Sequence, residues 1–152
     1  MIELEHIESN TGRLLGQTDS SLTKSIKNSF QKGDVLFGKL RPYLRKYAVA
    51  PFDGVCSSEI WVLKGTQLDN GFLYFLIQTD TFIEAANKSS GSKMPRADWS
   101  IVASLKFLIP SKKEQMKIAS FLFAIETKVA RTQAQLEKIE EWKKGLLQKM
   151  FV

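Results

Sequence analysis

The clearest hydrophobic pattern in the chain lies at its C-terminal end, in residues 111–152. Apolar side chains recur there at alternating spacings of four and three residues, the spacing of a heptad seam in a coiled-coil helix. The seam consists of Ile118, Leu122, Ile125, Val129, Leu136, Ile139, Leu146 and Met150, interrupted by the polar residues Thr132 and Lys143. The segment opens with Ser111-Lys-Lys-Glu114, which fits a helix capping box. We therefore expect one long helix that serves as a spacer and dimerisation arm.

The expected length of this helix sets it apart from the residues before it. At ~1.5 Å per residue it would run roughly 60 Å. The preceding ~110 residues would form a globule with a radius of gyration of only ~13 Å. We therefore expect the helix to extend beyond that globule, with its apolar seam covered by another helix.

Shorter patterns before residue 64 are typical of strands. In residues 1–7, Ile2 and Leu4 alternate with glutamates, which predicts a half-buried strand. Runs of branched and aromatic residues between turn sequences predict further strands at 35–37, 43–50 and 55–63. Residues 14–28 are polar and predict a loop or short helix. Together these segments suggest a meander of antiparallel strands.

The segment between the strands and the long helix completes an α+β prediction. Asp69 or Asn70 can cap a helix over residues 72–86, whose broad apolar face suits packing on a sheet. Residues 87–98 predict a loop, and the apolar positions in 99–109 predict a last strand. The expected fold is a small, mostly antiparallel sheet with a packed helix, followed by one long coiled-coil-forming helix. Residues 1–110 would form one domain and 111–152 the spacer helix.

Composition and charge narrow the class of protein. The 152 residues are 43% hydrophobic and 25% charged, as in a soluble globular protein with a core. We expect a cytoplasmic protein without membrane association, because no apolar run suits a bilayer span and the N-terminus lacks signal-peptide features. The single cysteine, Cys56, excludes an internal disulfide and a cysteine-cluster metal site. A net charge of +6 suits a polyanionic partner.

Sequence motifs for nucleotide chemistry are weak. Gly33-Asp-Val-Leu-Phe-Gly38-Lys39 has the letters of a phosphate-binding loop, but its interior is a strand sequence and the next residue is Leu40. Glu126-Thr-Lys128 resembles part of a nuclease site, yet it lies in the middle of the predicted helix, where a solvated charge pair is expected.

Isolated reactive side chains give no assembled active site either. His6 is the only histidine and has no nucleophile or metal-ligand pattern around it, and Cys56 is interpreted as a small packed residue. A nuclease would need carboxylates for magnesium, for which Asp34, Asp53 and Glu59 are the candidates near strands. The sequence therefore offers no assembled active site, and we expect no bound cofactor or metal ion.

Two basic segments are candidates for DNA contact. The first interleaves cations with tyrosine, and the second combines cations with hydroxyls around a glycine, which suits phosphate and base contacts. The candidate residues are Lys39, Arg41, Tyr43, Arg45 and Lys46 in the first segment, and Lys88, Ser89, Ser90, Ser92, Lys93 and Arg96 in the second. The alternatives are a solvated hairpin edge for the first and an ordinary connection for the second.

Several strings in one order resemble the specificity (S) subunit of type I restriction–modification systems. They are Gly33-Asp-Val-Leu-Phe-Gly-Lys-Leu-Arg-Pro42, Cys56-Ser-Ser-Glu-Ile60, Gly91-Ser-Lys-Met-Pro95, Ile109-Pro110, Glu114-Gln115 and Gly145-Leu-Leu-Gln-Lys-Met-Phe151. Each string is weak alone, but their order and spacing are specific and cover nearly the whole chain. The C-terminal third carries the strongest part of the resemblance.

The resemblance implies a DNA target recognition domain followed by a spacer helix. It implies a non-catalytic subunit that reads one half of a bipartite double-stranded DNA site and docks methyltransferase (M) subunits. S-adenosylmethionine would be bound by the M subunit, and a separate restriction (R) subunit would cleave DNA.

The chain departs from the family pattern in having one recognition unit and one helix where the family has two. The family's recognition domain also usually begins further upstream, so we expect a half-subunit or a form of it shortened at its N-terminus. The expected partner for the seam is a second copy in a homodimer that reads inverted repeats. The alternative is a coiled-coil adaptor or truncated fragment that dimerises or docks partners without reading DNA.

Overall fold

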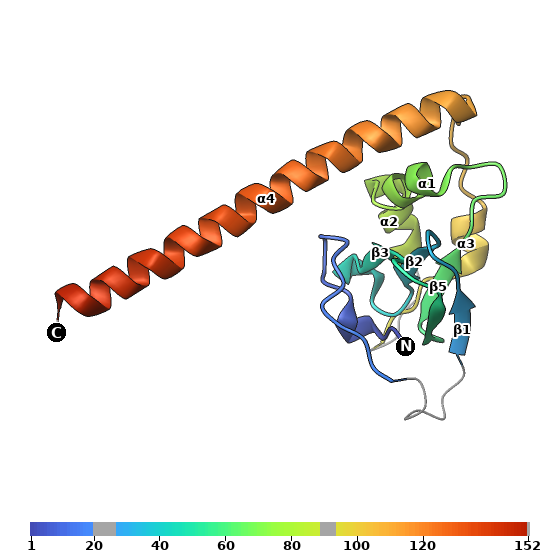
Figure 1. The fold of residues 1–152 in the computed structure, drawn as a ribbon. Coiled ribbons are helices and arrows are strands. Elements are labelled where there is room, and N and C mark those ends of the chain that lie inside the picture. Colours follow the sequence, from blue (N-terminus) through green and yellow to red (C-terminus); the bar gives the residue numbers. More distant parts are fainter. Residues whose placement is uncertain (20–26, 89–93, 152) are drawn as a thin grey trace. The chain divides into compact units, whose positions relative to one another are not determined.

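The computed structural model describes residues 1–19, 27–88 and 94–151. Short strands come first and helices follow (Figure 1). In chain order the elements are η1 (Leu4–His6), β1 (Lys27–Phe30), β2 (Val35–Gly38), η3 (Pro42–Leu44), β3 (Tyr47–Val49), β4 (Gly54–Ser57), β5 (Ile60–Leu63), α1 (Asn70–Leu76), α2 (Asp80–Asn87), α3 (Trp99–Ala103) and α4 (Lys112–Met150). The chain divides into two compact units, Met1–Met116 and Lys117–Val152. The predicted α+β class, with antiparallel sheets, packed helices and a long C-terminal helix, is confirmed.

A three-stranded antiparallel sheet in the order β3-β2-β5 is the centre of the first unit. The middle strand, β2, is buried at all four positions because both its edges and both its faces are covered. Phe37 of β2 lies opposite Tyr47 and Trp61 in the neighbouring strands. Residues paired across a sheet point to the same face, so these three rings form one aromatic surface.

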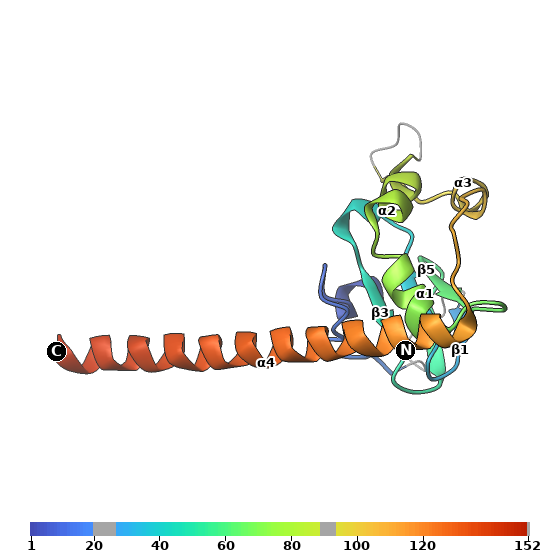
Figure 2. The same ribbon diagram turned by 90° about the horizontal axis from the view of Figure 1, so that it is seen from above.

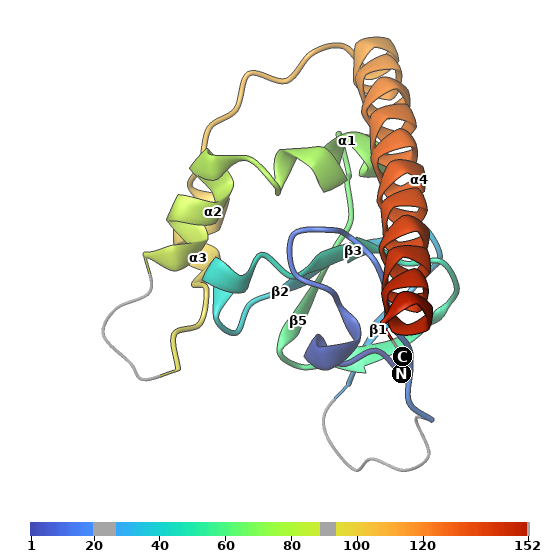
Figure 3. The same cartoon turned by 90° about the vertical axis from the view of Figure 1, so that its left-hand side faces the viewer.

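The helices cover this aromatic surface through ring-to-ring contacts. The helices α1, α2 and α3 each contribute one aromatic side chain that meets a strand aromatic edge to face, the arrangement that ring quadrupoles favour. The contacts are Tyr47–Tyr74 to α1 at 5.8 Å, Phe37–Phe82 to α2 at 5.2 Å and Trp61–Trp99 to α3 at 5.3 Å between ring centroids. Figure 3 shows α1 and α2 together on one side of β2 and β3.

The opposite side of the sheet is mainly aliphatic. Its buried cluster consists of Ile2, Ile7, Phe30, Leu36, Ala48, Ala50, Cys56 and Ile60. The antiparallel pair β1–β4 and the N-terminal residues supply most of this layer. Ile2 bridges Cys56, and the Lys46 ammonium donates to the carbonyl oxygens of Leu4 at 2.6 Å and Ile7 at 2.7 Å. The N-terminal segment is therefore fixed in the core.

The strand predictions are confirmed in part. The strand predicted at 35–37 is β2, but residues 55–63 form two strands, because a turn at Ser58 and Glu59 sends β4 to β1 and β5 to β2. The predicted simple meander is therefore wrong. Residues 43–50 begin with η3, because Arg41 and Arg45 adopt left-handed backbone conformations that bound a tight turn.

The strand predicted for residues 1–7 is also wrong. Isolated bridges at Ile2 and Ile7 flank the short helix η1. The reason lies in His6, whose Nδ1 accepts a hydrogen bond from the Glu3 amide at 2.9 Å and closes the turn. Residues 14–28 were predicted to form a loop or short helix, and residues 20–26 of this range lie outside the described residues. At the two ends of the range, Leu14 forms a bridge with Ile7 and β1 begins at Lys27.

Capping side chains explain why the observed helices differ from the predicted elements. Asp69 caps α1 by accepting from the Phe72 amide at 3.1 Å, but the helix predicted over 72–86 is broken by a second cap, Thr79, which starts α2. The strand predicted at 99–109 is wrong. Asp98 caps the short helix α3 by accepting from the Ser100 amide at 2.8 Å, and the residues that follow form a connection without regular structure.

The long helix α4 begins as predicted and continues for 39 residues without a break (Figure 2). The Ser111 hydroxyl accepts from the Glu114 amide at 3.4 Å, and the Glu114 carboxylate accepts from the Ser111 amide at 3.0 Å, which confirms the capping box. The carboxylate also accepts from the Ser111 hydroxyl at 2.6 Å. These hydrogen bonds, led by the one from the hydroxyl, lower the pKa of Glu114. The buried Gln115 accepts from the Asp69 amide at 2.8 Å and donates to the Pro110 carbonyl, so it joins this first turn to α1.

A search of the described helices for membrane-spanning segments finds none that combines the required length and apolar character.

Candidate nucleic-acid interface

The fold brings the two basic segments side by side. The Arg41 amide donates to the Pro95 carbonyl at 2.7 Å, and the Ala97 amide donates to the Lys39 carbonyl at 2.8 Å. Leu40 and Arg96 therefore form an antiparallel bridge directly after β2. Segments predicted separately from the sequence thus become one continuous piece of surface.

Glu59 connects a third segment to this surface. Its carbonyl accepts from the Lys39 amide at 2.9 Å, and its carboxylate meets the Arg96 guanidinium. Arg96 Nε lies 3.0 Å from Oε2, and Arg96 Nη2 lies 3.0 Å from Oε1. The hydrogen bond and the negative charge of Glu59 together raise the pKa of Arg96. Arg96 is therefore fixed at its backbone and at its side chain.

Two tryptophans lie beside this ion pair. Trp61 and Trp99 line a shallow depression of about 550 Å³ together with Lys39, Lys88 and Arg96. The Trp99 side chain is 54% exposed even though one side of its ring meets Trp61. Such a combination of cations and an accessible aromatic ring suits a polyanion that also carries flat bases.

The other predicted DNA-contact residues have different surroundings. Tyr43 and Arg41 are exposed, Arg45 pairs with Asp80 at 2.6 Å, and Lys46 bonds to the N-terminal carbonyls. Ser89, Ser90, Ser92 and Lys93 lie outside the described residues. The structure therefore brings together Lys39, Lys88 and Arg96 and gives Arg45 and Lys46 intramolecular partners. The assignment of all eleven residues to DNA contact stays a prediction.

Sequence reasoning missed three contributors to this surface, Glu59 as an ion-pair partner, Trp61 and Trp99. Glu59 and Arg96 are 37 residues apart, and no local pattern links them. Asp98 carried a usable signal, because aspartate is a favoured N-cap residue immediately before a helix. That signal would have placed Trp99 on a helix and not in a strand.

The three carboxylates considered for a nuclease go to separate partners. Asp34 accepts from the Gln31 amide at 2.7 Å and pairs with Lys64, Asp53 accepts from the Lys32 amide at 2.7 Å, and Glu59 pairs with Arg96. Within residues 1–19, 27–88 and 94–151, no three histidine, cysteine or acidic side chains are grouped to hold a metal ion.

The weak phosphate-loop motif, His6 and Cys56 all have structural roles in the fold. The Gly33–Lys39 match contains β2, whose backbone pairs with strands on both sides. His6 Nδ1 accepts from a backbone amide, and Nε2 lies 3.2 Å from the Thr18 hydroxyl. Cys56 is fully buried, and burial raises the pKa of its thiol to about 11, so it is a packed residue as predicted.

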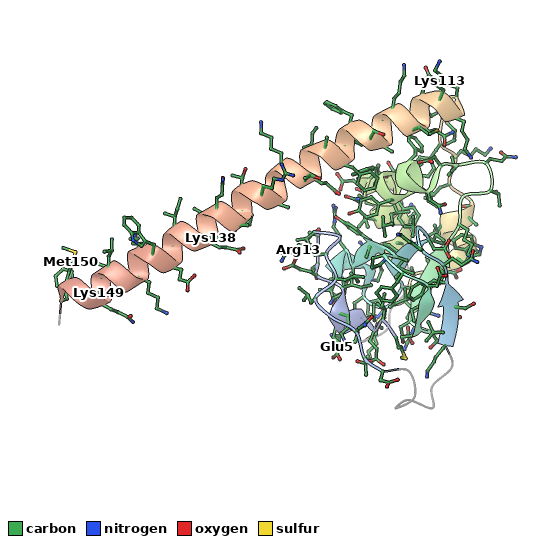
Figure 4. The ribbon with its side chains drawn as sticks, viewed as in Figure 1. Glu5, Arg13, Lys113, Lys138, Lys149 and Met150 are labelled. Atoms are coloured by element: carbon green, nitrogen blue, oxygen red, sulfur yellow. The ribbon has the colours of Figure 1, made fainter. Side chains whose placement is uncertain are left out.

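The seam of α4 is exposed along most of its length in this single chain. The exposed fractions include 44% for Ile125, 63% for Val129, 60% for Ile139 and 72% for Met150. The Thr132 hydroxyl donates to the Lys128 carbonyl at 3.0 Å, which satisfies its hydrogen-bonding group within the helix. Side chains project along the whole of α4, with Lys138, Lys149 and Met150 labelled in Figure 4.

Comparison with known proteins gives consistent matches. The chain is 34% identical over 117 residues to the type I restriction enzyme EcoDI specificity subunit of Escherichia coli, covering 74% of this chain and 26% of that protein. It is 24% identical over 139 residues to the HindI specificity subunit of Haemophilus influenzae, covering 86% of this chain and 30% of that protein. The chain therefore spans less than a third of the length of these relatives.

Solved structures share the fold. The crystal structure of the HsdS subunit from Thermoanaerobacter tengcongensis superposes with a TM-score of 0.73 at 23% sequence identity, covering 88% of this chain and 37% of that one. The family model described as the type I restriction modification DNA specificity domain matches residues 6–141, which is most of the chain. The chain therefore belongs to the type I restriction modification DNA specificity domain family.

Proposed function

We propose that this chain is a sequence-specific DNA-recognition module of a type I restriction–modification enzyme. It reads one half of a bipartite site in double-stranded DNA and docks methyltransferase subunits. The observation that carries the proposal is the pairing of Lys39–Arg41 with Pro95–Ala97, because it gathers Lys39, Lys88 and Arg96 around an exposed tryptophan. The family membership gives this surface its context.

The proposed division of labour leaves the chemistry to partner subunits. The M subunit binds S-adenosylmethionine and transfers the methyl group, and the R subunit cleaves DNA. The chain itself needs no cofactor and acts as a non-catalytic subunit. The separate intramolecular partners of Asp34, Asp53 and Glu59 support this proposal.

The side chains of the surface suggest two kinds of DNA contact. Lys39 and Lys88 make no ion pair within the described residues, so their flexible ammonium groups suit phosphates along the backbone. Arg96 is held in one orientation and suits a contact that needs fixed geometry. Phosphate contacts would supply affinity, and Arg96 would supply selectivity.

The helix α4 would complete the module by pairing with a second helix. An apolar seam in water is stabilised when another helix covers it, and a second copy offers an identical seam. In such a homodimer, two recognition modules would read the two halves of an inverted repeat. The exposure of Val129, Ile139 and Met150 supports this part of the proposal.

A second candidate function is that of a coiled-coil adaptor that docks partners without reading DNA. Two observations favour it, the exposed seam of α4 and the intramolecular partners of Arg45, Lys46 and Arg96. A cation that already has an intramolecular partner loses part of its interaction with that partner when it binds phosphate, which makes DNA binding less favourable. The two candidates differ in the expected dependence of DNA affinity on salt.

Titration of a fluorescent 30-base-pair duplex at 50–200 mM salt tests the proposed function. A DNA-recognition module should show log affinity falling linearly with log salt, with a slope of about −0.9 per phosphate contacted. Lys39→Ala and Lys88→Ala should each make this slope shallower by about 1. Lys138→Ala is the matched control, because it removes the same charge from exposed α4. Absence of DNA binding throughout the salt range would favour the adaptor.

A further inference from the structure

The arrangement of Arg96 and Glu59 leaves part of the guanidinium available to a ligand. An arginine side chain has five N–H donors in a planar fork. Glu59 occupies the side formed by Nε and Nη2, with N–O distances of 3.0 Å to each carboxylate oxygen. The donors at the far end, on Nη1 and Nη2, point away from that carboxylate. Arg96 is half exposed, at 49%, so a ligand can approach this end.

The support beneath Arg96 is rigid. Hydrogen bonds on both sides of Arg96, from Arg41 to Pro95 and from Ala97 to Lys39, fix its backbone against the end of β2. The Glu59 carbonyl accepts from Lys39, so the backbone of Glu59 belongs to the same hydrogen-bonded layer. The Glu59 amide also lies 3.3 Å from the Ser57 hydroxyl. Both ends of the ion pair are therefore positioned before any ligand binds.

An ordinary surface ion pair is the simpler interpretation of the same geometry. Exposed pairs contribute little to stability, and they need no second function. Two features distinguish this pair. Glu59 is only 26% exposed, and Glu59 meets the Nε side of the guanidinium, leaving the end that can bind a flat acceptor pair. By comparison, Arg13 pairs with Glu8 at 3.7 Å with a single contact and 62% exposure.

We propose that Glu59 is a positioning residue that presents the free end of Arg96 to the major-groove edge of a guanine. Two parallel N–H donors match the O6 and N7 acceptors of guanine, and no other base offers two acceptors there. The fixed orientation makes the contact selective, because the fork loses little conformational freedom when it binds. This inference rests on the proposed DNA-reading function and names one base that the module recognises.

The first step of the test identifies the preferred sequence. The full chain is incubated with duplexes that contain a randomised central segment, and the bound fraction is sequenced. Wild-type protein should select a G·C pair at a position whose selection disappears in Arg96→Ala and Arg96→Lys. Lysine keeps the charge but lacks the fork, so Arg96→Lys should keep the salt slope and lose only this preference.

Glu59→Gln tests whether Glu59 positions Arg96, because it leaves the positive charge of Arg96 unchanged. It keeps the size and one acceptor but removes the negative charge that holds Arg96. We expect it to weaken discrimination at the same G·C pair, with selection at the other positions unchanged. Glu8→Gln and Arg13→Ala each break the exposed Glu8–Arg13 ion pair and serve as matched controls that should leave the selected sequence unchanged. Thermal unfolding shows whether each variant remains folded.

A modified base tests direct contact between Arg96 and guanine, because a purely structural role of Arg96 would not make binding depend on the guanine N7 atom. Replacing the selected guanine by 7-deazaguanine removes the N7 acceptor and should weaken wild-type binding by roughly tenfold or more. The same replacement should have no effect on Arg96→Ala. Equal losses in both proteins, or an unchanged selected sequence in Arg96→Ala, would overturn the inference. Selection of no sequence by wild-type protein would instead overturn the proposed function and the inference with it.

Discussion

Single residues in this chain have roles that depend on what their side chains already bind. Lys46 and Arg96 are both cations in the basic segments, yet their environments differ. The Lys46 ammonium satisfies two carbonyls of the N-terminal segment, whereas Arg96 keeps donors on the side of its guanidinium that Glu59 does not occupy. In the sequence, Lys46 and Arg96 are equivalent candidates for DNA contact, because both are cations in basic segments. Their hydrogen-bond partners distinguish a residue that supports the fold from one that can meet a ligand.

Lys46→Met is expected to destabilise the fold without changing sequence preference. It removes charge-assisted hydrogen bonds to Leu4 and Ile7 and leaves those carbonyls without their ammonium donor, so the free energy of unfolding should fall by about 2 kcal/mol. Urea unfolding measures this change. Lys32→Met is the control, because Lys32 is exposed. Similar stability in the two variants would show that the carbonyl contacts contribute little.

Glu114→Gln is expected to reduce the pH dependence of stability. The capping bonds from Ser111 lower the pKa of folded Glu114 below its unfolded value of about 4.3. This contribution is therefore present above that value and is lost as pH falls through the folded pKa. Urea unfolding between pH 7 and pH 2 should show a wild-type advantage that disappears in acid. Glu137→Gln, in the middle of α4, is the control, and a constant difference across this pH range would contradict the prediction.

At the scale of elements, helices and strands meet through aromatic pairs, and caps decide where helices begin. The capping box of α4 and the strand β2 could be predicted because their signals are local. The break at Thr79 and the helix after Asp98 were missed, because apolar spacing was given more weight than a capping side chain. The pairing of β5 with β2 could not be predicted, since long-range strand order depends on contacts that no local pattern records.

Part of the candidate site could be predicted in the same way. The two basic segments were visible in the sequence because cations cluster locally. Their union was not, because it depends on backbone hydrogen bonds between Lys39–Arg41 and Pro95–Ala97. The Glu59–Arg96 ion pair was hidden for the same reason. Sequence therefore predicted a polyanionic ligand, and the fold was needed to show which of the basic side chains lie together.

Lys143→Leu is expected to strengthen self-association through α4. Lys143 interrupts the seam, and an apolar residue at that position would be buried by a partner helix. Burial of a leucine corresponds to roughly tenfold tighter dimerisation or more. Sedimentation over a range of concentrations measures this change. Lys144→Leu adds the same side chain one position away from the seam, and an equal gain in this control would show that the seam is not the contact surface.

At the scale of the whole molecule, the proposed homodimer and the DNA-reading function are linked. One recognition module can read only one half of a bipartite site, so reading both halves requires a second module, which a second copy would supply in the proposed homodimer. The basic balance of +6 per chain would double in a homodimer and strengthen attraction to DNA. Association through α4 would thus supply both a second reading surface and additional charge.

Multi-angle light scattering at tens of micromolar is expected to give twice the chain mass of 17.2 kDa. A second run with the methyltransferase subunit should show a larger complex that contains both proteins. A monomer at these concentrations would exclude the homodimer. A monomer that also recruits no methyltransferase would show that the chain is a fragment whose function needs a longer polypeptide.

The edge-to-face contact of Trp61 and Trp99 also gives the protein an optical reporter. The chain contains three tryptophans, and the third, Trp142, lies on α4. Two indole rings with centroids 5.3 Å apart couple their excited states, so their circular dichroism depends on their mutual angle. In Trp142→Phe, all tryptophan emission would come from this pair, which borders the Arg96 surface. Ligand arrival at that surface could then be followed without a dye.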